Sequence, residues 1–260
     1  MTQEIYSIDF YIAGCNFEFR INDAIVLNYL QGTPLKSEIN INEWIANGDN
    51  YFEIIFNNNQ FSDVFDSNFN YTIKLYKRNI NQPKSSREEI TSFVGTYQED
   101  SEPQSSLSLS KHFQADVPFN KWKWLGSQVI TDDFSNKNQI MAIYTEFWQA
   151  LKSNELEKLL KMTSERTKEM ATAYYMTVED KTAINRESFI DSMNGSNLGM
   201  DLYELDFEEL DLKLFANNRL ACFLDSNGNP PICYVNFELG FANYLPIKLC
   251  KINNNFEIIR

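Results

Sequence analysis

The chain contains a single histidine, which excludes several common kinds of active site. His112 is the only histidine in 260 residues. A Ser-His-Asp triad, a histidine-rich zinc site or a histidine proton relay would each depend on this one position. Residues 110–114 around it are typical of a strand edge or loop, so we interpret His112 as an exposed structural residue. We therefore assign no catalytic residue.

Cysteine is also scarce, and its spacing excludes common metal and redox motifs. The four cysteines include no CxxC pair, so we assign no metal and no cofactor. In a reducing compartment they are expected to be buried thiols. The pattern places Cys222 and Cys233 on facing strands of a hairpin that turns at residues 225–230.

Long apolar runs are absent as well. No run approaches the roughly 18 apolar residues that a membrane helix requires. Residues 1–9 carry neither the basic region nor the apolar region of a signal peptide. We expect a cytoplasmic protein that has no membrane partner.

Positive charge is in short supply. The chain has 36 acidic and 23 basic residues, and its formal net charge is -13. Residues 1–130 hold ten basic and sixteen acidic side chains, and residues 131–260 hold thirteen and twenty, so both halves are acidic. Such a field repels nucleic-acid backbones and attracts basic proteins. The alternative is that the acidity serves solubility alone.

The residues that are abundant predict a folded chain whose first part is β-rich. Apolar residues make up 43% of the chain and aromatic residues 14%. Apolar and polar residues alternate over 4–13, 15–21, 51–56 and 71–76, with polar loops near 81–86 and 99–106. Short strands at this spacing predict an antiparallel β-sandwich-like domain over residues 1–130.

Residues 131–260 change to a helical pattern and then return to strands, which makes the fold class α+β. Asp133 or Ser135 could cap a helix. Its apolar face would comprise Ile140, Ile143, Tyr144, Phe147, Trp148 and Leu151. Further helices are expected over 156–160, 165–175 and 186–193, followed by strands over 219–225, 232–238, 244–251 and 256–260.

The second half resembles the NTF2-like (cystatin-like) α+β fold. The resemblance covers residues 137–260 and is carried by 140–160, 245–251 and 256–259. It implies helices packed on a curved antiparallel sheet that leaves a cone-shaped pocket. Some members of this family are isomerases or dehydratases that use Asp, His or Tyr in the pocket, and many only bind proteins. This half has no histidine and no evident Asp–Tyr pair, which counts against an enzyme.

The most distinctive segment is residues 201–211, which place six carboxylates among large apolar residues. Tyr203, Leu205 and Phe207 alternate with acids, and the phase then slips by one residue. A β-bulge at Glu208 and Glu209 would absorb the slip. We therefore expect one long, bent strand with an acidic outer face. That face would comprise Asp201, Glu204, Asp206, Glu208, Glu209 and Asp211.

The whole layout resembles a bacterial toxin-neutralising immunity protein, a class that is commonly small, cytoplasmic, acidic and without catalytic motifs. The hypothesis is a non-enzymatic module that binds a basic protein partner through the six carboxylates, with nearby exposed aromatic residues as anchors. The negative charge of such an interface would attract a basic toxin, and the bound module would then occlude it. The competing interpretation is that the acids form only the solvated face of a strand.

Two other functions remain open at this point. The first is an NTF2-like pocket enzyme or small-ligand carrier, for which Tyr174, Tyr175 and Glu238 are the candidate polar groups. The second is a divalent-cation site, formed by the six carboxylates or by the loop at residues 225–229. That loop lacks a glutamate at calcium-loop spacing, because the twelfth position from Asp225 is Asn236. A β-turn is the simpler interpretation of this loop.

Overall fold

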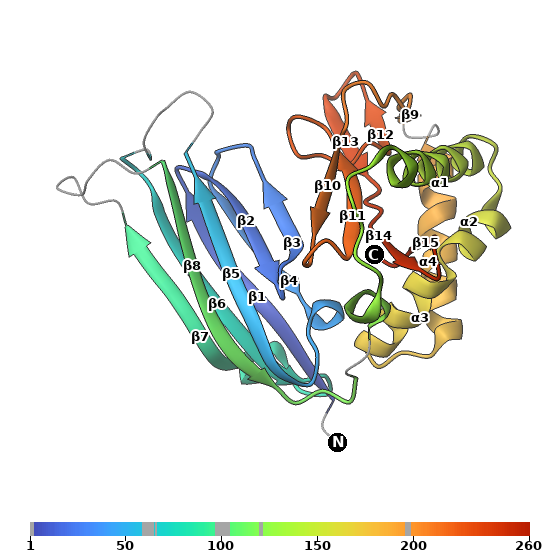
Figure 1. The fold of residues 1–260 in the computed structure, drawn as a ribbon. Coiled ribbons are helices and arrows are strands. Elements are labelled where there is room, and N and C mark those ends of the chain that lie inside the picture. Colours follow the sequence, from blue (N-terminus) through green and yellow to red (C-terminus); the bar gives the residue numbers. More distant parts are fainter. Residues whose placement is uncertain (1–2, 59–64, 66, 97–104, 120–121, 196–198) are drawn as a thin grey trace. The chain divides into compact units, whose positions relative to one another are not determined.

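The computed structural model describes residues 3–58, 65, 67–96, 105–119, 122–195 and 199–260. The chain divides into two compact units, Met1–Asn120 and Lys121–Arg260. The division falls ten residues before the boundary expected from the sequence. Within the described ranges the chain is mixed α+β, with four α-helices and four antiparallel sheets (Figure 1).

Two four-stranded antiparallel sheets form the first unit, with the strand orders β4-β1-β6-β7 and β3-β2-β5-β8. Aromatic rings join the sheets: Phe10 lies 4.9 Å from Phe19, and Phe52 lies 5.6 Å from Phe93, between ring centroids. Such contacts bury large apolar area. The strands are β1 Glu4–Ala13, β2 Asn16–Ile21, β3 Ala24–Tyr29, β4 Leu35–Asn40, β5 Gly48–Asn57, β6 Asn70–Asn79, β7 Glu88–Thr96 and β8 Ser106–Ala115.

Strands β3 and β4 were not expected from the sequence. Asn22 and Asp23 both adopt positive φ, 51° and 64°, as the two central residues of a tight hairpin turn do. They turn the chain directly from β2 into β3. Residues 25–29 of β3 are half-buried throughout, so the strand lacks the alternation that would identify it.

The other features expected in the first unit have mixed outcomes. His112 is exposed on β8, which is an edge strand of its sheet, as expected. Its Nδ1 lies 2.9 Å from Asp49 Oδ2. The polar segment 81–86 contains a short 3-10 helix, η2 (Lys84–Ser86). Residues 99–104 of the second expected loop lie outside the described residues. Another short 3-10 helix, η1 (Asn42–Trp44), precedes β5.

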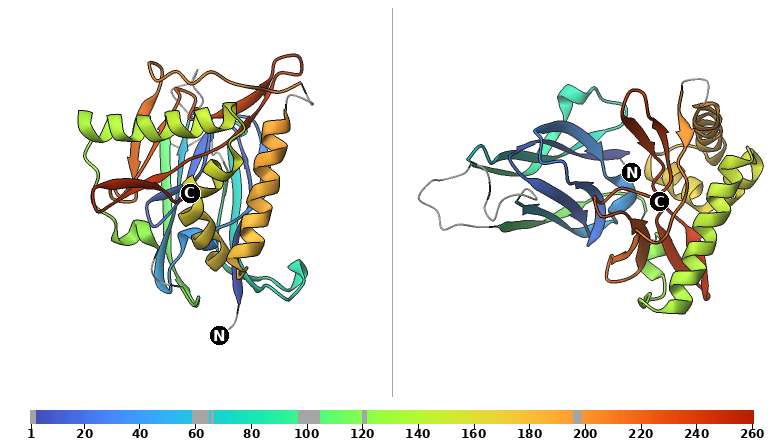
Figure 2. Two further views of the ribbon diagram at one scale, coloured as in Figure 1. Left: turned by 90° about the vertical axis from the view of Figure 1, so that its right-hand side faces the viewer. Right: turned by 90° about the horizontal axis from the view of Figure 1, so that it is seen from above.

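The second unit begins with a short 3-10 helix and four α-helices. Asp133 caps α1 as expected, because its Oδ1 accepts a hydrogen bond from Asn136 N at 2.8 Å. The fourth helix begins eight residues earlier than expected, at a cap formed by Thr177. Figure 2 shows α1 running across the direction of α4. The elements are η3 Lys123–Gly126, α1 Phe134–Lys152, α2 Leu156–Met162, α3 Ser164–Ala173 and α4 Val178–Met193.

Two antiparallel sheets follow these helices, with the orders β10-β11-β14-β15 and β13-β12-β9. Cys222 on β11 and Cys233 on β12 belong to different sheets, so the expected facing pair on one hairpin is wrong; all four cysteines are buried. The strands are β9 Asp201–Leu202, β10 Asp211–Phe215, β11 Leu220–Leu224, β12 Cys233–Asn236, β13 Phe241–Tyr244, β14 Leu249–Ile252 and β15 Asn255–Ile258.

The core of the second unit joins α1 to the first of these sheets. The fully buried Tyr144 hydroxyl donates a hydrogen bond to Ile247 O at 2.7 Å and accepts one from Phe223 N at 3.1 Å. Its ring meets the Phe223 ring at 5.4 Å. One side chain of α1 therefore satisfies two backbone groups of the strand layer.

We expect Tyr144→Phe to lower the free energy of unfolding by about 1–3 kcal/mol, because two buried backbone groups lose their partner. Urea unfolding at neutral pH measures this change. Tyr203→Phe is the matched control: this ring is half exposed, and we expect a change within about 0.5 kcal/mol. Equal, small effects of the two substitutions would contradict the role assigned to the Tyr144 hydroxyl.

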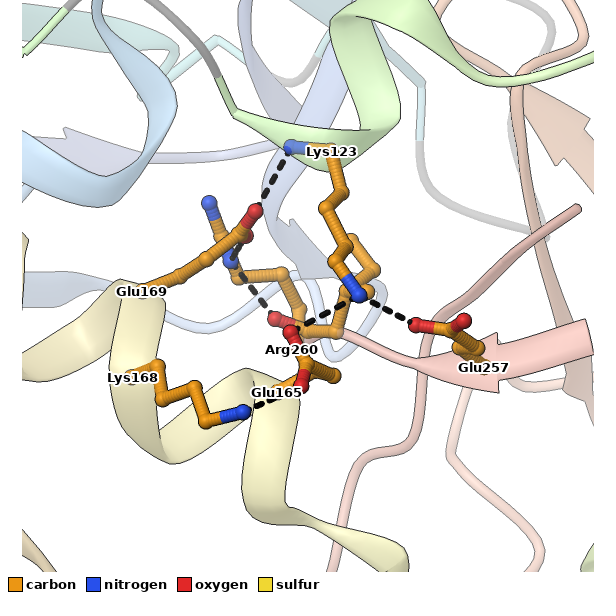
Figure 3. A network of polar contacts seen from close by, with 7 residues as sticks. Lys123, Glu165, Lys168, Glu169, Glu257 and Arg260 are labelled. Atoms are coloured by element: carbon orange, nitrogen blue, oxygen red, sulfur yellow. Dashed lines mark hydrogen bonds and ion pairs between the residues drawn. The ribbon is translucent and has the colours of Figure 1, made fainter. Parts of the chain in front are cut away.

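A network of charged residues ties α3 to η3 and β15 (Figure 3). Buried Glu169 pairs with buried Arg260 and accepts a hydrogen bond from the backbone N–H of Lys123 at 2.6 Å. The ammonium group of Lys123 contacts Glu165 at 2.8 Å and Glu257 at 2.7 Å. Burial favours the neutral amine, but these two hydrogen bonds raise the pKa of Lys123 to about 12. The charges of this network pair with one another, so we assign it to the stability of the fold.

This network also lies close to Cys250. Burial, with repulsion from Glu169 and Glu257, raises the pKa of the Cys250 thiol from 9.0 to about 12. Because the folded state holds the thiol proton more tightly than the unfolded state, the contribution of this group to stability is complete below pH 9. That contribution is lost as the pH rises toward 12. We expect the wild-type chain to lose up to about 1.4 kcal/mol per pH unit in this window. Urea unfolding between pH 8 and pH 11 should show a shallower slope for Cys250→Ala, and an unchanged slope would contradict the assignment.

No helix within the described ranges has the combination of length and apolar character that spanning a membrane requires.

Candidate functional site

The acidic segment is not the bent strand that the alternation predicted. Asp201 and Leu202 form β9, which pairs with β12, whereas β10 starts at Asp211 and pairs with β11 in the other sheet. Residues 203–210 between them have no strand pairing and make a turn at 207–209. The expected bulge at Glu208 and Glu209 is therefore wrong, because the segment passes from one sheet to the other.

Hydrogen bonds fix this passage on both sides. Tyr203 N donates to Cys233 O at 2.9 Å, and the indole Nε1 of Trp148 donates to Tyr203 O at 2.8 Å. Asp206 Oδ1 accepts a hydrogen bond from Glu208 N at 2.9 Å, which holds the turn. The backbone of the segment is thus positioned by α1, by β12 and by its own carboxylate.

The alternation correctly predicted the exposure of the carboxylates, but not the strand and not the exposure of Tyr203. All six carboxylates are exposed, while the apolar residues Leu205 and Phe207 are half-buried and Leu210 is buried. An irregular segment lying over an apolar core buries alternate residues much as a strand does. The six carboxylates nevertheless have different surroundings.

Three of the six carboxylates line an open groove of about 510 Å³. These are Glu204, Asp206 and Glu209, and Asp225 from the turn after β11 joins them. Asp201 and Glu208 do not line it, and Asp211 is paired with Lys213 at 3.1 Å. We call this hollow the acidic groove. Its remaining lining residues are Tyr203, Leu210, Pro230, Pro231, Cys233, Val235 and Tyr244.

The charge of the acidic groove is uncompensated. None of the described residues that line it is basic, and in the described part of the chain no lysine or arginine pairs with its glutamates. By contrast, Glu89 and Asp9 in the first unit each pair with a basic side chain, Lys74 and Arg87 respectively. Burial, reinforced by the charge of Asp225, raises the pKa of the Cys233 thiol. The groove thus favours a cationic occupant.

Asp225 has a structural role in addition to its charge. Its Oδ1 accepts hydrogen bonds from Asn227 N and Asn229 N, both at 2.8 Å, and its Oδ2 accepts one from Asn229 Nδ2 at 3.1 Å. Gly228 N donates to Asp225 O at 2.9 Å, which closes a turn. The simpler interpretation of this loop as a β-turn is confirmed. The sequence singled out Asp225 for its loop and did not connect it with the acidic segment.

The polar residues named for a small-ligand pocket do not meet. Tyr174 and Tyr175 end α3, where Tyr175 adopts a positive φ of 57°. Glu238 is exposed in the turn between β12 and β13. None of the three lines the acidic groove or a second hollow of about 410 Å³ beside α4, which includes Ile184 and Tyr234.

The groove also contains two tyrosines that the sequence did not identify as site residues. Tyr203 and Tyr244 lie on its wall, with exposures of 50% and 38%. Tyr244 comes from β13, which the sequence merged with the following strand. A tyrosine side chain offers an apolar face and a hydroxyl to a bound cationic group. The acidic groove therefore combines negative charge with aromatic surface.

Comparison with protein-family models, with curated proteins and with solved structures gave no match to this chain.

Proposed function

We propose that the chain is a non-enzymatic binding module that captures a basic protein through the acidic groove. The observation that carries the proposal is the set of exposed carboxylates, Glu204, Asp206 and Glu209, gathered in one hollow with no cation among its described lining residues. A concave surface of one sign raises the association rate of an oppositely charged partner. The whole-chain charge of -13 acts in the same direction.

The class of module that we propose is an immunity protein that neutralises a secreted bacterial toxin. A nuclease, or another toxin that acts on an anionic substrate, has a basic cleft, and an acidic surface can both approach and occlude it. The proposed activity is occlusion and requires no chemistry from this chain. The charged network of Lys123, Glu169 and Arg260 is excluded from this role because its groups pair with one another.

The proposal includes a fold assignment for each unit: a β-sandwich-like first unit and an NTF2-like second unit. The aromatic contacts between the two sheets of the first unit support the former. The packing of α1 on antiparallel strands through Tyr144 supports the latter. Both assignments are compatible with a scaffold that presents a surface to a protein partner.

The test is capture of partners from the native cytoplasm and from toxin-containing culture, at low and at high salt, followed by mass spectrometry. The bait is the wild-type chain, and the comparison bait is Glu204→Lys/Glu209→Lys. We expect one stoichiometric basic protein that is lost at high salt and is absent from the charge-reversed bait. The captured protein's own activity should fall on addition of the wild-type chain. Identical captures by the two baits would contradict the proposal.

A further inference from the structure

The turn between β12 and β13 exposes large apolar side chains to solvent. Phe237 is 67% exposed and Leu239 is 74% exposed. Phe237 and Leu239 are two of the four most exposed large apolar side chains in the described part of the chain. Single exposed apolar residues are ordinary, whereas neighbouring exposed apolar residues contribute to the kind of patch that serves in binding. We call these two residues the hairpin tip.

The hairpin tip is held in place by its own hydrogen bonds. Gly240 N donates to Asn236 O at 2.9 Å, and Leu239 N donates to Asn236 Oδ1 at 2.8 Å. Asn236 is buried, and Gly240 has the positive φ of 68° that this turn requires. The apolar side chains are therefore presented by an ordered turn, which lowers the entropic cost of binding through them.

The hairpin tip is continuous with the acidic groove. Cys233 and Val235 of β12 and Tyr244 of β13 line the groove, and Val235 precedes Phe237 by two residues, roughly 7 Å along a strand. Glu238 is exposed within the tip and extends the negative charge to it. A partner seated on the groove therefore reaches the tip.

We infer that the hairpin tip is the apolar anchor of the interface, taken up by an apolar pocket on a basic protein partner; the inference rests on the proposed function. Charge supplies the association rate, and buried apolar anchors supply the residence time. A second copy of this chain is a poor occupant, because each copy carries a charge of -13.

The test uses three synthetic peptides of equal length, composed of Leu and Lys, of Ser and Lys, or of Leu and Glu. Amide chemical shifts of the full chain map each peptide, and titrations give its Kd. The variant Phe237→Ala/Leu239→Ala removes the tip, and Phe134→Ala, at an 81% exposed position on α1, is the matched control. Backbone spectra of the free variants verify that they fold.

We expect the Leu-Lys peptide to shift amides of both the groove and the tip, and to bind roughly tenfold tighter than the Ser-Lys peptide. Phe237→Ala/Leu239→Ala should abolish that advantage, whereas Phe134→Ala should preserve it. Equal binding of the two basic peptides at the groove would overturn the inference that the hairpin tip is an apolar anchor, and it would leave the proposed function unaffected. Binding of neither basic peptide at the groove would overturn both.

Two further outcomes would overturn the anchor inference alone. The first is tight binding of the Leu-Glu peptide at the tip, which would show that the partner need not be basic. The second is a dimer in sedimentation experiments that Phe237→Ala/Leu239→Ala dissociates, which would assign the tip to a second copy of the chain.

Discussion

Arg260→Met is expected to lower the free energy of unfolding by about 3–5 kcal/mol, because the substitution leaves the buried carboxylate of Glu169 without its cation. Both side chains of this pair are almost completely buried, so solvent cannot replace the lost interaction. The Glu169 carboxylate also accepts the Lys123 backbone N–H at 2.6 Å, so it cannot turn toward water without breaking a second contact. Urea unfolding followed by circular dichroism measures the change.

Two variants separate the buried charge from simple loss of packing. Glu169→Gln/Arg260→Met removes both charges while the glutamine oxygen can still accept the Lys123 N–H, so we expect it to recover more than half of the lost stability. Lys168→Met breaks an exposed ion pair with Glu165 and should cost less than about 1 kcal/mol. If Arg260→Met costs no more than Lys168→Met, the buried pair does not have the role assigned here.

Charge reversal in the acidic groove is expected to have the largest effect on binding. We expect Glu204→Lys/Glu209→Lys to weaken the Ser-Lys peptide by roughly tenfold or more at low salt, and to flatten the salt dependence of its Kd. All three acids of the segment line the groove. The two glutamates are chosen because Asp206 also holds the turn through Glu208 N.

Asp201→Lys/Glu208→Lys is the matched control, because it makes the same change in charge within the same segment but outside the groove lining. We expect this control to slow association at low salt and to change Kd by only a few-fold. If the two double variants weaken the peptide equally, the whole segment acts as a diffuse acidic patch, and the groove has no special role.

The sequence predicted individual helices and exposed positions better than it predicted which strands pair with one another. The apolar face of α1 was correct, and its cap is Asp133, one of the two candidates, because a 3.6-residue period and a capping side chain are both local signals. The start of α4 was missed because its first residues, Val178, Glu179 and Asp180, are all exposed. A helix that lies mostly in solvent has little periodicity to detect.

The candidate site shows the same limit. The alternation over residues 201–211 correctly predicted that the six carboxylates are exposed, but it wrongly placed Tyr203 on the apolar face. It also could not show that β9 and β10 belong to different sheets. That division brings Asp225 and Tyr244 to Glu204, and all three are distant in sequence. The hairpin tip carried a local signal, because Phe237 and Leu239 flank Glu238 just before Gly240. The alternation nevertheless placed Phe237 in the strand expected over 232–238, and Leu239 was given no role.

The most direct test of the account is carboxylate footprinting of the chain, free and in complex with the basic protein that it captures. The account predicts that Glu204, Asp206 and Glu209 are labelled in the free chain and protected in the complex, while the exposed Asp132 near the start of α1 stays labelled. Unchanged labelling of the three groove carboxylates in a stoichiometric complex would contradict the central claim that the acidic groove is the binding surface.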